Sequence, residues 1–137
     1  GETRNGLIEA ARIARGAIRP ITELIERDED ALFFPGGLGA AKNLCDFAAK
    51  GAGYGVQPDV ARVVHEFHAA GKPMAFCCIA PMIAARLLGT AAGGPGVSIT
   101  LGPPSPAADV ASALGATHIV TRVREAHTDR AARVVTT

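Results

Sequence analysis

The chain has 137 residues, 48% of them hydrophobic, which suits one domain that can bury a core. Fourteen Lys and Arg against thirteen Asp and Glu leave a formal net charge of +1, and no basic cluster indicates a nucleic-acid partner. No run of about 18 apolar residues predicts a membrane span.

Three cysteines, two of them adjacent, indicate a reducing compartment rather than a disulfide framework. No CxxC or HExxH pattern points to zinc or another metal. The N-terminal stretch is unlike a signal or transit peptide, because Glu2 and Glu9 interrupt it. Three Lys against eleven Arg favour a bacterial cytoplasmic source, with the mitochondrial matrix as the alternative.

The predicted elements begin with a helix over residues 5–15, where apolar side chains recur at helical spacing. A shorter helical piece is predicted near 20–27. The apolar run ALFF, residues 31–34, precedes a Pro-Gly-Gly turn and predicts a strand buried on both faces. A helix over 40–51 follows, and then a Gly-rich loop.

The second half of the chain continues this alternation of strands and helices. The helix over 58–70 has the clearest pattern, with apolar residues at i, i+3, i+4 and i+7. Alternating strands and helices with short connections are typical of a parallel sheet covered on both faces, so the predicted class is α/β. The remaining predicted elements are a strand over 73–78, a helix over 80–89, a strand over 97–102, a helix over 107–114, and strands over 118–122 and 133–137.

The stretch MAFCCIAPMIAARLL, residues 74–88, places two cysteines between a buried strand and a helix. In open α/β folds ligands bind at the carboxyl ends of the strands, where both Gly36-Gly37 and Cys77-Cys78 fall. A thiol at a sharp strand-to-helix turn is held above the sheet, and the helix dipole favours its anionic form. Cys78 lies at the turn itself and is therefore the candidate nucleophile.

Backbone N–H groups are expected to complete this site. Gly36 and Gly37 lack a Cβ and can turn their N–H groups towards the pocket. With the N–H of Ile79 they predict an oxyanion hole. The alternative for the cysteine pair is simple packing, because cysteine is among the most buried residue types and the elbow pattern prefers a small residue where Phe76 stands.

Five segments of the sequence together resemble one family: TRNGLIEAARIARG, FFPGGLGAAKNL, EFHAAGKP, CCIAPMIAA and VVTT. They are similar to the enhancing-lycopene-biosynthesis (ElbB) proteins and their mitochondrial relatives. This family is a branch of the class I glutamine amidotransferase-like superfamily that also contains the PfpI/ThiJ proteins. The resemblance covers nearly all of the chain.

The resemblance implies a flavodoxin-like, doubly wound parallel sheet sandwiched by helices, with Cys78 as the elbow cysteine. It also implies, for some members, a glyoxalase III activity on small dicarbonyls that needs no cofactor, and a homodimer. Family members begin with a strand and a Gly-rich turn whose glutamate contacts the elbow cysteine, and they continue past VVTT with another strand and helix. Because neither segment occurs here, residues 1–137 are interpreted as one partial amidotransferase-like domain whose acid/base residue lies elsewhere.

Three further residues are predicted to contact substrate: Gly36, Lys42 and Pro81. The Lys42 cation would attract a carbonyl oxygen or a carboxylate at the pocket mouth, with a solvated lysine as the alternative. His65 and His68 share a helix face but have no third ligand, so they are interpreted as solvated.

The other histidines and the third cysteine are predicted to have no catalytic role. His118 opens a predicted strand, and His127 is placed in a polar turn. Neither follows the cysteine as an amidotransferase triad requires, so glutamine hydrolysis is disfavoured. Cys45, on the helix over 40–51, is interpreted as packing.

Two function hypotheses follow. The first is a cofactor-independent glyoxalase III-like enzyme in which the Cys78 thiolate adds to glyoxal or methylglyoxal, the N–H groups of Gly37 and Ile79 stabilise the alkoxide, and a 2-hydroxy acid is released. The alternative is a non-catalytic ligand-binding or redox-sensing protein linked to isoprenoid metabolism, in which Cys78 is oxidised. A third possibility is an inert chain, because a sheet without its edge elements exposes unpaired backbone.

Overall fold

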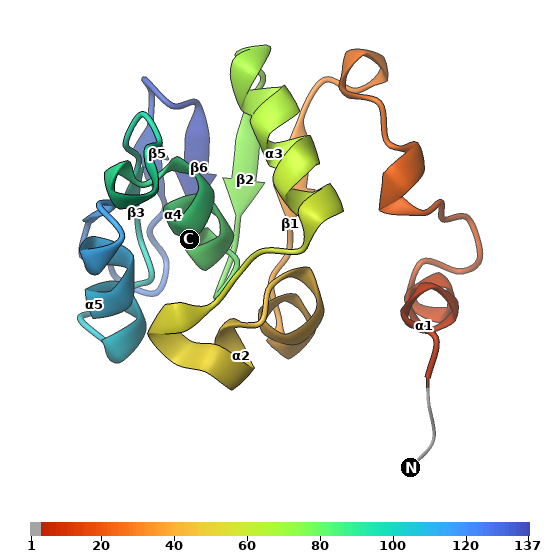
Figure 1. The fold of residues 1–137 in the computed structure, drawn as a ribbon, viewed down its shortest axis with the longest axis horizontal. Helices are drawn as coiled ribbons and strands as arrows, with labels where there is room; N and C mark the ends of the chain where they lie inside the picture. The colour runs from red at the N-terminus through yellow and green to blue at the C-terminus, as the bar shows by residue number, and fades with distance from the viewer. Residues whose placement is uncertain (1–3) are drawn as a thin grey trace.

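In the computed structural model, which describes residues 4–137, short strands form two sheets (Figure 1). The larger sheet has the strand order β1-β2-β6-β5, and the smaller one pairs β3 with β4. Strands β1, β2 and β6 are parallel, whereas β5 is antiparallel to β6. The strands are β1 (Leu32–Phe34), β2 (Met74–Phe76), β3 (Ser98–Ile99), β4 (Thr117–His118), β5 (His127–Asp129) and β6 (Val134–Thr136).

Helices connect successive parallel strands, and most begin within one residue of the predicted start. Proline occupies the first turn of α3, α4 and α5, where its missing N–H costs nothing. The predicted helical piece near 20–27 is a pair of 3-10 turns, Ile21–Glu23 and Glu26–Asp28. The α-helices are α1 (Gly6–Ile13), α2 (Phe47–Lys50), α3 (Pro58–Ala69), α4 (Pro81–Leu88) and α5 (Pro106–Ala113).

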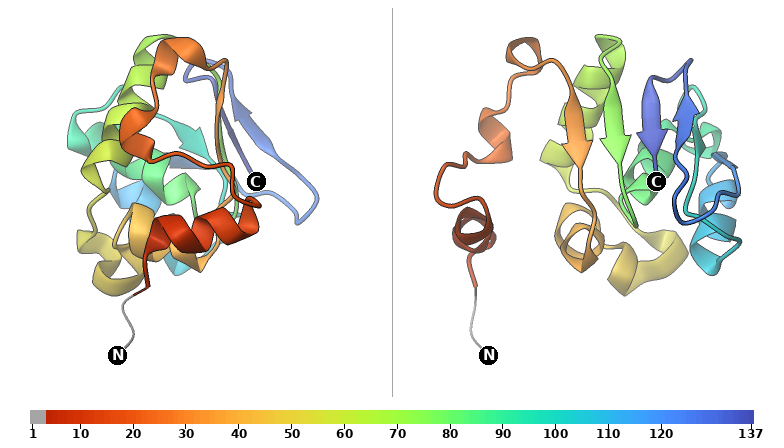
Figure 2. Two further views of the ribbon diagram at one scale, coloured as in Figure 1. Left: turned by 90° about the vertical axis from the view of Figure 1, so that its right-hand side faces the viewer. Right: turned by 180° about the vertical axis from the view of Figure 1, so that it is seen from behind.

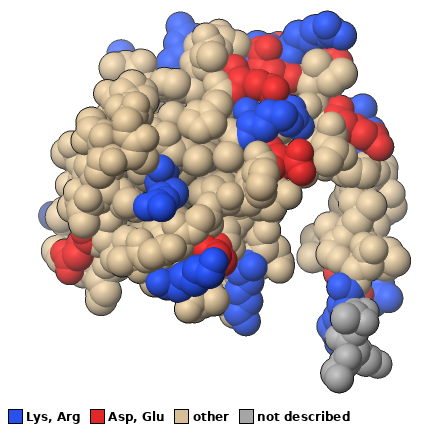
Figure 3. All heavy atoms as spheres, in the orientation of Figure 1, with Lys and Arg blue, Asp and Glu red and all other residues tan. Residues whose placement is uncertain are grey.

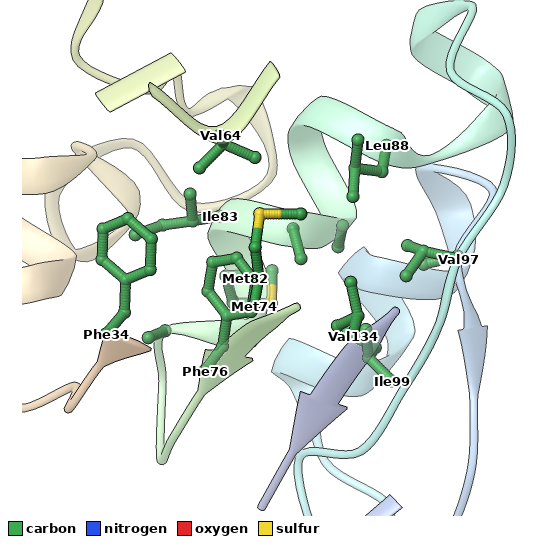
Figure 4. Close-up of a cluster of buried hydrophobic side chains, with 14 of the residues drawn as sticks. Phe34, Val64, Met74, Phe76, Met82, Ile83, Leu88, Val97, Ile99 and Val134 are labelled. Atoms are coloured by element: carbon green, nitrogen blue, oxygen red, sulfur yellow. The ribbon is translucent and has the colours of Figure 1, made fainter. Parts of the chain in front are cut away.

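The core lies between the larger sheet and helices α3 and α4 (Figure 4). Alternate strand residues point into it, so Phe34, Phe76 and Val134 are at most 5% exposed. The rings of Phe34 and Phe76 stack with their centroids 4.9 Å apart, which fixes β1 against β2. Burying each of these side chains contributes about 1.5–3 kcal/mol.

The opposite sheet face carries Phe33, Ala75 and Val135 in register across three strands. Phe33 is 61% exposed there. Figure 2 shows α1 beyond the β1 edge of the sheet, and α1 buries none of its residues. In the view of Figure 3, acidic and basic side chains lie next to one another, and the numbers of the two kinds in the sequence are nearly equal. No helix within residues 4–137 has the length and apolar character needed to cross a bilayer.

The prediction of one continuous helix over 40–51 is wrong. The structure has a π-helical turn over Ala40–Leu44, an extended Cys45, and then α2. Cys45 forms an isolated bridge with Val56, and the Asp46 carboxylate accepts a hydrogen bond from the Gly55 N–H at 2.6 Å. These tertiary contacts with the following loop outweigh the local helical preference.

The structure also corrects the placement of His127, which lies in β5 rather than in a polar turn. β5 has the sequence His-Thr-Asp and lacks the apolar alternation that predicts strands. It pairs with β6 on one side and is held by polar side chains on the other. His118, predicted to open a strand, is the last residue of β4.

Candidate active site

The candidate site lies at the carboxyl ends of β1 and β2. β1 ends at Phe34 and is followed by the Pro-Gly-Gly turn, and β2 ends at Phe76 and is followed by the two cysteines. The Cys77 N–H donates to the Phe34 carbonyl oxygen at 3.0 Å, which continues the pairing of the two strands one residue further. The glycine turn and the cysteine turn are therefore adjacent, as the sequence predicts.

Cys78 has the sharp backbone turn expected of a nucleophile elbow. Its φ is +59°, and its side chain is exposed, whereas Cys77 is half-buried. This exposure is unlike that of a core residue and favours the elbow interpretation, while the nucleophile role of Cys78 stays a prediction. The Cys78 N–H donates to the backbone oxygen of Thr137 at 2.8 Å, a contact that the sequence analysis missed because backbone acceptors leave no residue pattern.

Helix α4 begins directly after this turn. The Ala80 N–H donates to the Cys77 carbonyl oxygen at 3.0 Å, and Pro81 occupies the first helical position. Pro81 is buried. It is compatible with the start of a helix because it has no N–H to leave unpaired, and its predicted contact with substrate stays a prediction.

Gly36 permits the close approach of the two turns. It has a φ of +86°, and a Cβ built on it would lie 2.4 Å from the Cys77 carbonyl oxygen and 3.0 Å from the Cys78 Cβ. Real Cβ atoms do not approach backbone oxygens so closely, so only glycine fits here. Gly37 also has a positive φ, of +83°, but a Cβ there would meet nothing within 4 Å.

The N–H groups of Gly36, Gly37 and Ile79 donate to no backbone carbonyl within the described part of the chain. Ile79 follows Cys78 in the chain, Gly36 packs against the cysteine turn, and Gly37 is the next residue of that glycine loop. Free backbone donors beside an exposed thiol are the chemical requirement for binding an oxyanion.

Lys42 is exposed on the π-helical turn and lines a cavity of about 310 Å³ with Cys45, Asp46 and Gln57. Cys78 is not among the residues that line this cavity. Burial raises the pKa of the Cys45 thiol. Cys45 is 5% exposed, in agreement with the packing role predicted for it.

The histidines lie away from the elbow turn. His65 is exposed and His68 half-buried on α3. The His118 Nε2 accepts the Leu101 N–H at 3.3 Å, and the His127 Nε2 lies 2.7 Å from the Ser98 Oγ. Residues 4–137 contain no cluster of three or more His, Cys, Asp or Glu that could hold a metal ion.

The hydrogen bonds described for residues 4–137 include none between the Cys78 thiol and an Asp, Glu or His side chain. A general acid or base for chemistry at Cys78 is therefore not among these contacts.

Comparison with known proteins identifies relatives over the whole chain. It is 47% identical to the glutamine amidotransferase-like class 1 domain-containing protein 3, mitochondrial, of Homo sapiens, covering 100% of this chain and 52% of that protein. It is 46% identical to the ES1 protein homolog, mitochondrial, of Rattus norvegicus, covering 99% and 52%. The chain thus spans about half the length of the curated relatives it matches. No family profile matches the chain.

Solved structures show the same architecture. An isoprenoid biosynthesis protein with an amidotransferase-like domain from Ehrlichia chaffeensis superimposes with a TM-score of 0.86 at 31% identity, covering 99% of this chain and 60% of that one. The Francisella tularensis Rapid Encystment Protein 24 kDa has a TM-score of 0.57 at 12% identity, over 86% of this chain and 55% of that one, and shares the fold alone. The predicted flavodoxin-like α/β class is confirmed. Across its length, this chain is similar to the mitochondrial glutamine amidotransferase-like class 1 and ES1 proteins and to the isoprenoid biosynthesis protein with an amidotransferase-like domain.

Proposed function

We propose that the protein is a cofactor-independent glyoxalase III-like enzyme that converts glyoxal or methylglyoxal to a 2-hydroxy acid. The observation that carries the proposal is the exposed Cys78 at a left-handed turn directly before helix α4. A thiol in this position is accessible to a small aldehyde, and it lies beside the N-terminus of helix α4.

The reaction begins when the Cys78 thiolate attacks the aldehyde carbon and forms a C–S bond, so that the carbonyl electron pair moves to oxygen. The N–H groups of Gly37 and Ile79 donate to the resulting alkoxide. A base removes the proton from the former aldehyde carbon, and the proton returns to the neighbouring carbonyl carbon. The first carbon is thereby oxidised and the second reduced, which gives a thioester of the 2-hydroxy acid.

Water then attacks the thioester, breaks the C–S bond, and releases the 2-hydroxy acid and the thiol. The sum is one dicarbonyl plus one water giving one 2-hydroxy acid, so no external oxidant or cofactor takes part. The base is the glutamate that the family resemblance implies. Gly36 and Lys42 remain proposed substrate contacts.

The test compares the full-length protein with its Cys78→Ser variant. The readouts are loss of glyoxal and formation of glycolate. We expect the variant to lose at least about a hundredfold in kcat/KM, because the serine hydroxyl is not ionised at neutral pH. Cys77→Ser is the matched control and should keep its rate within about threefold. Equal rates for Cys78→Ser and the unmodified protein would eliminate the mechanism.

A second candidate function is a redox-sensing or ligand-binding role linked to isoprenoid metabolism. It is favoured by the missing acid/base contact at the Cys78 thiol and by the name of the Ehrlichia chaffeensis neighbour, an isoprenoid biosynthesis protein. Mild peroxide followed by intact-mass measurement separates the two functions. A gain of one or two oxygen atoms at Cys78 without glyoxal turnover supports the sensor, and turnover without such an adduct speaks against it.

We propose a mitochondrial location over the bacterial cytoplasm, because the relatives from Homo sapiens, Rattus norvegicus and Danio rerio are all named mitochondrial proteins. A homodimer also remains a proposal from the family resemblance, with a small aldehyde as substrate and no nucleic acid or membrane as partner. Light scattering of the purified protein tests the oligomeric state.

A further inference from the structure

The threonines at the end of β6 have no role in the chemistry described above. Thr136 and Thr100 are each 0% exposed, and they are the two buried polar residues among residues 4–137. A buried polar side chain is costly unless its hydrogen bonds are made. Their positions at the carboxyl ends of β6 and β3 place them on the edge of the fold that also carries Cys78.

Thr136 joins the ends of two strands from different sheets. Its Oγ1 accepts the Thr100 N–H at 2.8 Å. The Thr100 Oγ1 in turn lies 2.8 Å from the Thr121 Oγ1 and accepts the Gly102 N–H at 3.0 Å. A chain of hydrogen bonds therefore connects the carboxyl end of β6 to the segments that follow β3 and β4.

The next residue, Thr137, holds the cysteine turn. Its backbone oxygen accepts the Cys78 N–H at 2.8 Å, and its N–H donates to the Phe76 carbonyl oxygen at 3.3 Å. The Thr137 Oγ1 donates to the Glu125 carbonyl oxygen at 3.2 Å. Any shift of the end of β6 therefore moves the acceptor of the Cys78 N–H.

We propose that Thr136 is a positioning residue for Cys78. Its hydroxyl fixes the end of β6, and the Thr137 backbone oxygen transmits that position to the elbow. The proposal rests on the proposed function in one respect, namely that Cys78 is the reactive thiol. When the hydrogen bond between the Thr136 hydroxyl and the Thr100 N–H is lost, Cys78 relaxes towards a negative φ, because an L residue favours that region. The thiol then leaves its place before helix α4.

The test measures the rate at which iodoacetamide alkylates Cys78 across pH 5 to 9, by peptide mass spectrometry, in Thr136→Val. We expect about a fivefold lower rate, the factor by which relaxation of a left-handed residue changes its population. Thr136→Ser keeps the hydroxyl and should leave the rate equal to that of the unmodified protein. Thr121→Val loosens Thr100 from its other side, should lower the rate about twofold, and keeps the test open if Thr136→Val does not fold.

Ser98→Ala is the matched control, because it removes the contacts of the Ser98 hydroxyl with His127 and Asp129 at the opposite end of β3. It should lower stability without changing the rate at Cys78. The proposal is overturned if Ser98→Ala slows alkylation as much as Thr136→Val, or if neither threonine variant changes the rate. Alkylation does not require glyoxal turnover, so slower alkylation in a protein that leaves glyoxal unconsumed would refute the proposed enzyme and retain the positioning role.

Discussion

Cys78 is one of three residues other than glycine with a positive φ within residues 4–137, the others being Arg15 and Arg133. Such a conformation costs about 1–2 kcal/mol for an L residue, so neighbouring contacts have to stabilise it. Gly36 lies against the peptide that joins Cys77 to Cys78, where a Cβ on residue 36 would be 2.4 Å from the Cys77 carbonyl oxygen.

We expect Gly36→Ala to lower the free energy of unfolding by about 3 kcal/mol, since the new methyl group meets a backbone oxygen and the residue keeps a left-handed φ. Alkylation of Cys78 should slow at the same time. Gly37→Ala is the matched control, because its methyl group has open space, and it should cost only about 1 kcal/mol. Urea unfolding of both variants measures the difference. Equal losses would show that the contact with Cys77 does not matter.

For single residues, the sequence predicts which side chain occupies the turn but does not predict which backbone oxygen accepts its N–H. The boundary between an apolar strand and a helix was enough to choose Cys78 over Cys77, and the structure exposes the residue so chosen. The Thr137 oxygen that receives the Cys78 N–H could not be predicted, because every residue carries such an oxygen and only the strand order brings this one into place.

Among the elements, β5 shows how polar contacts replace apolar burial at the edge of the sheet. The Asp129 carboxylate accepts the Ser98 N–H at 2.7 Å, the Ser98 hydroxyl at 3.0 Å and the Ala132 N–H at 2.9 Å. Burial opposes its ionisation, but these hydrogen bonds outweigh that effect and lower the pKa of Asp129 below its ordinary 3.8.

Because the folded state lowers this pKa, Asp129 contributes stability above pH 3.8 that is lost as the pH falls through its lower, folded-state value. We expect Asp129→Asn to reduce the free energy of unfolding at pH 7 by about 1 kcal/mol and to flatten its decline in acid. Urea unfolding at a series of pH values from 7 to about 2 measures both effects. The exposed Asp109→Asn serves as control. An unchanged acid profile for Asp129→Asn would contradict the assignment.

The elements that sequence patterns predicted well are those whose burial follows their own periodicity. The helix expected over 58–70 is α3, Pro58–Ala69, because its apolar face packs on the core. The helix expected over 40–51 is interrupted, because Cys45 pairs with Val56 in the following loop. β5 was missed since its polar residues carry no strand periodicity and its partners lie far along the chain.

For the molecule as a whole, alternation of strands and helices was sufficient to predict the α/β class, which the Ehrlichia chaffeensis structure confirms. The antiparallel β5 and the separate β3-β4 ladder were not predictable, because pairing partners depend on the whole topology. The fold also gives the three cysteines different surroundings. Cys45 is 5% exposed, Cys77 is half-buried, and Cys78 is exposed at the strand ends.

The most direct test of this account is the order in which the three thiols react. Native protein is treated with limiting iodoacetamide at pH 7, and the labelled peptides are mapped by mass spectrometry. The structure requires label at Cys78 first, slower label at Cys77, and label at Cys45 only after unfolding in urea. Reaction at Cys77 as fast as at Cys78, or protection of Cys78 until the protein unfolds, would contradict the central claim that one exposed thiol forms the site.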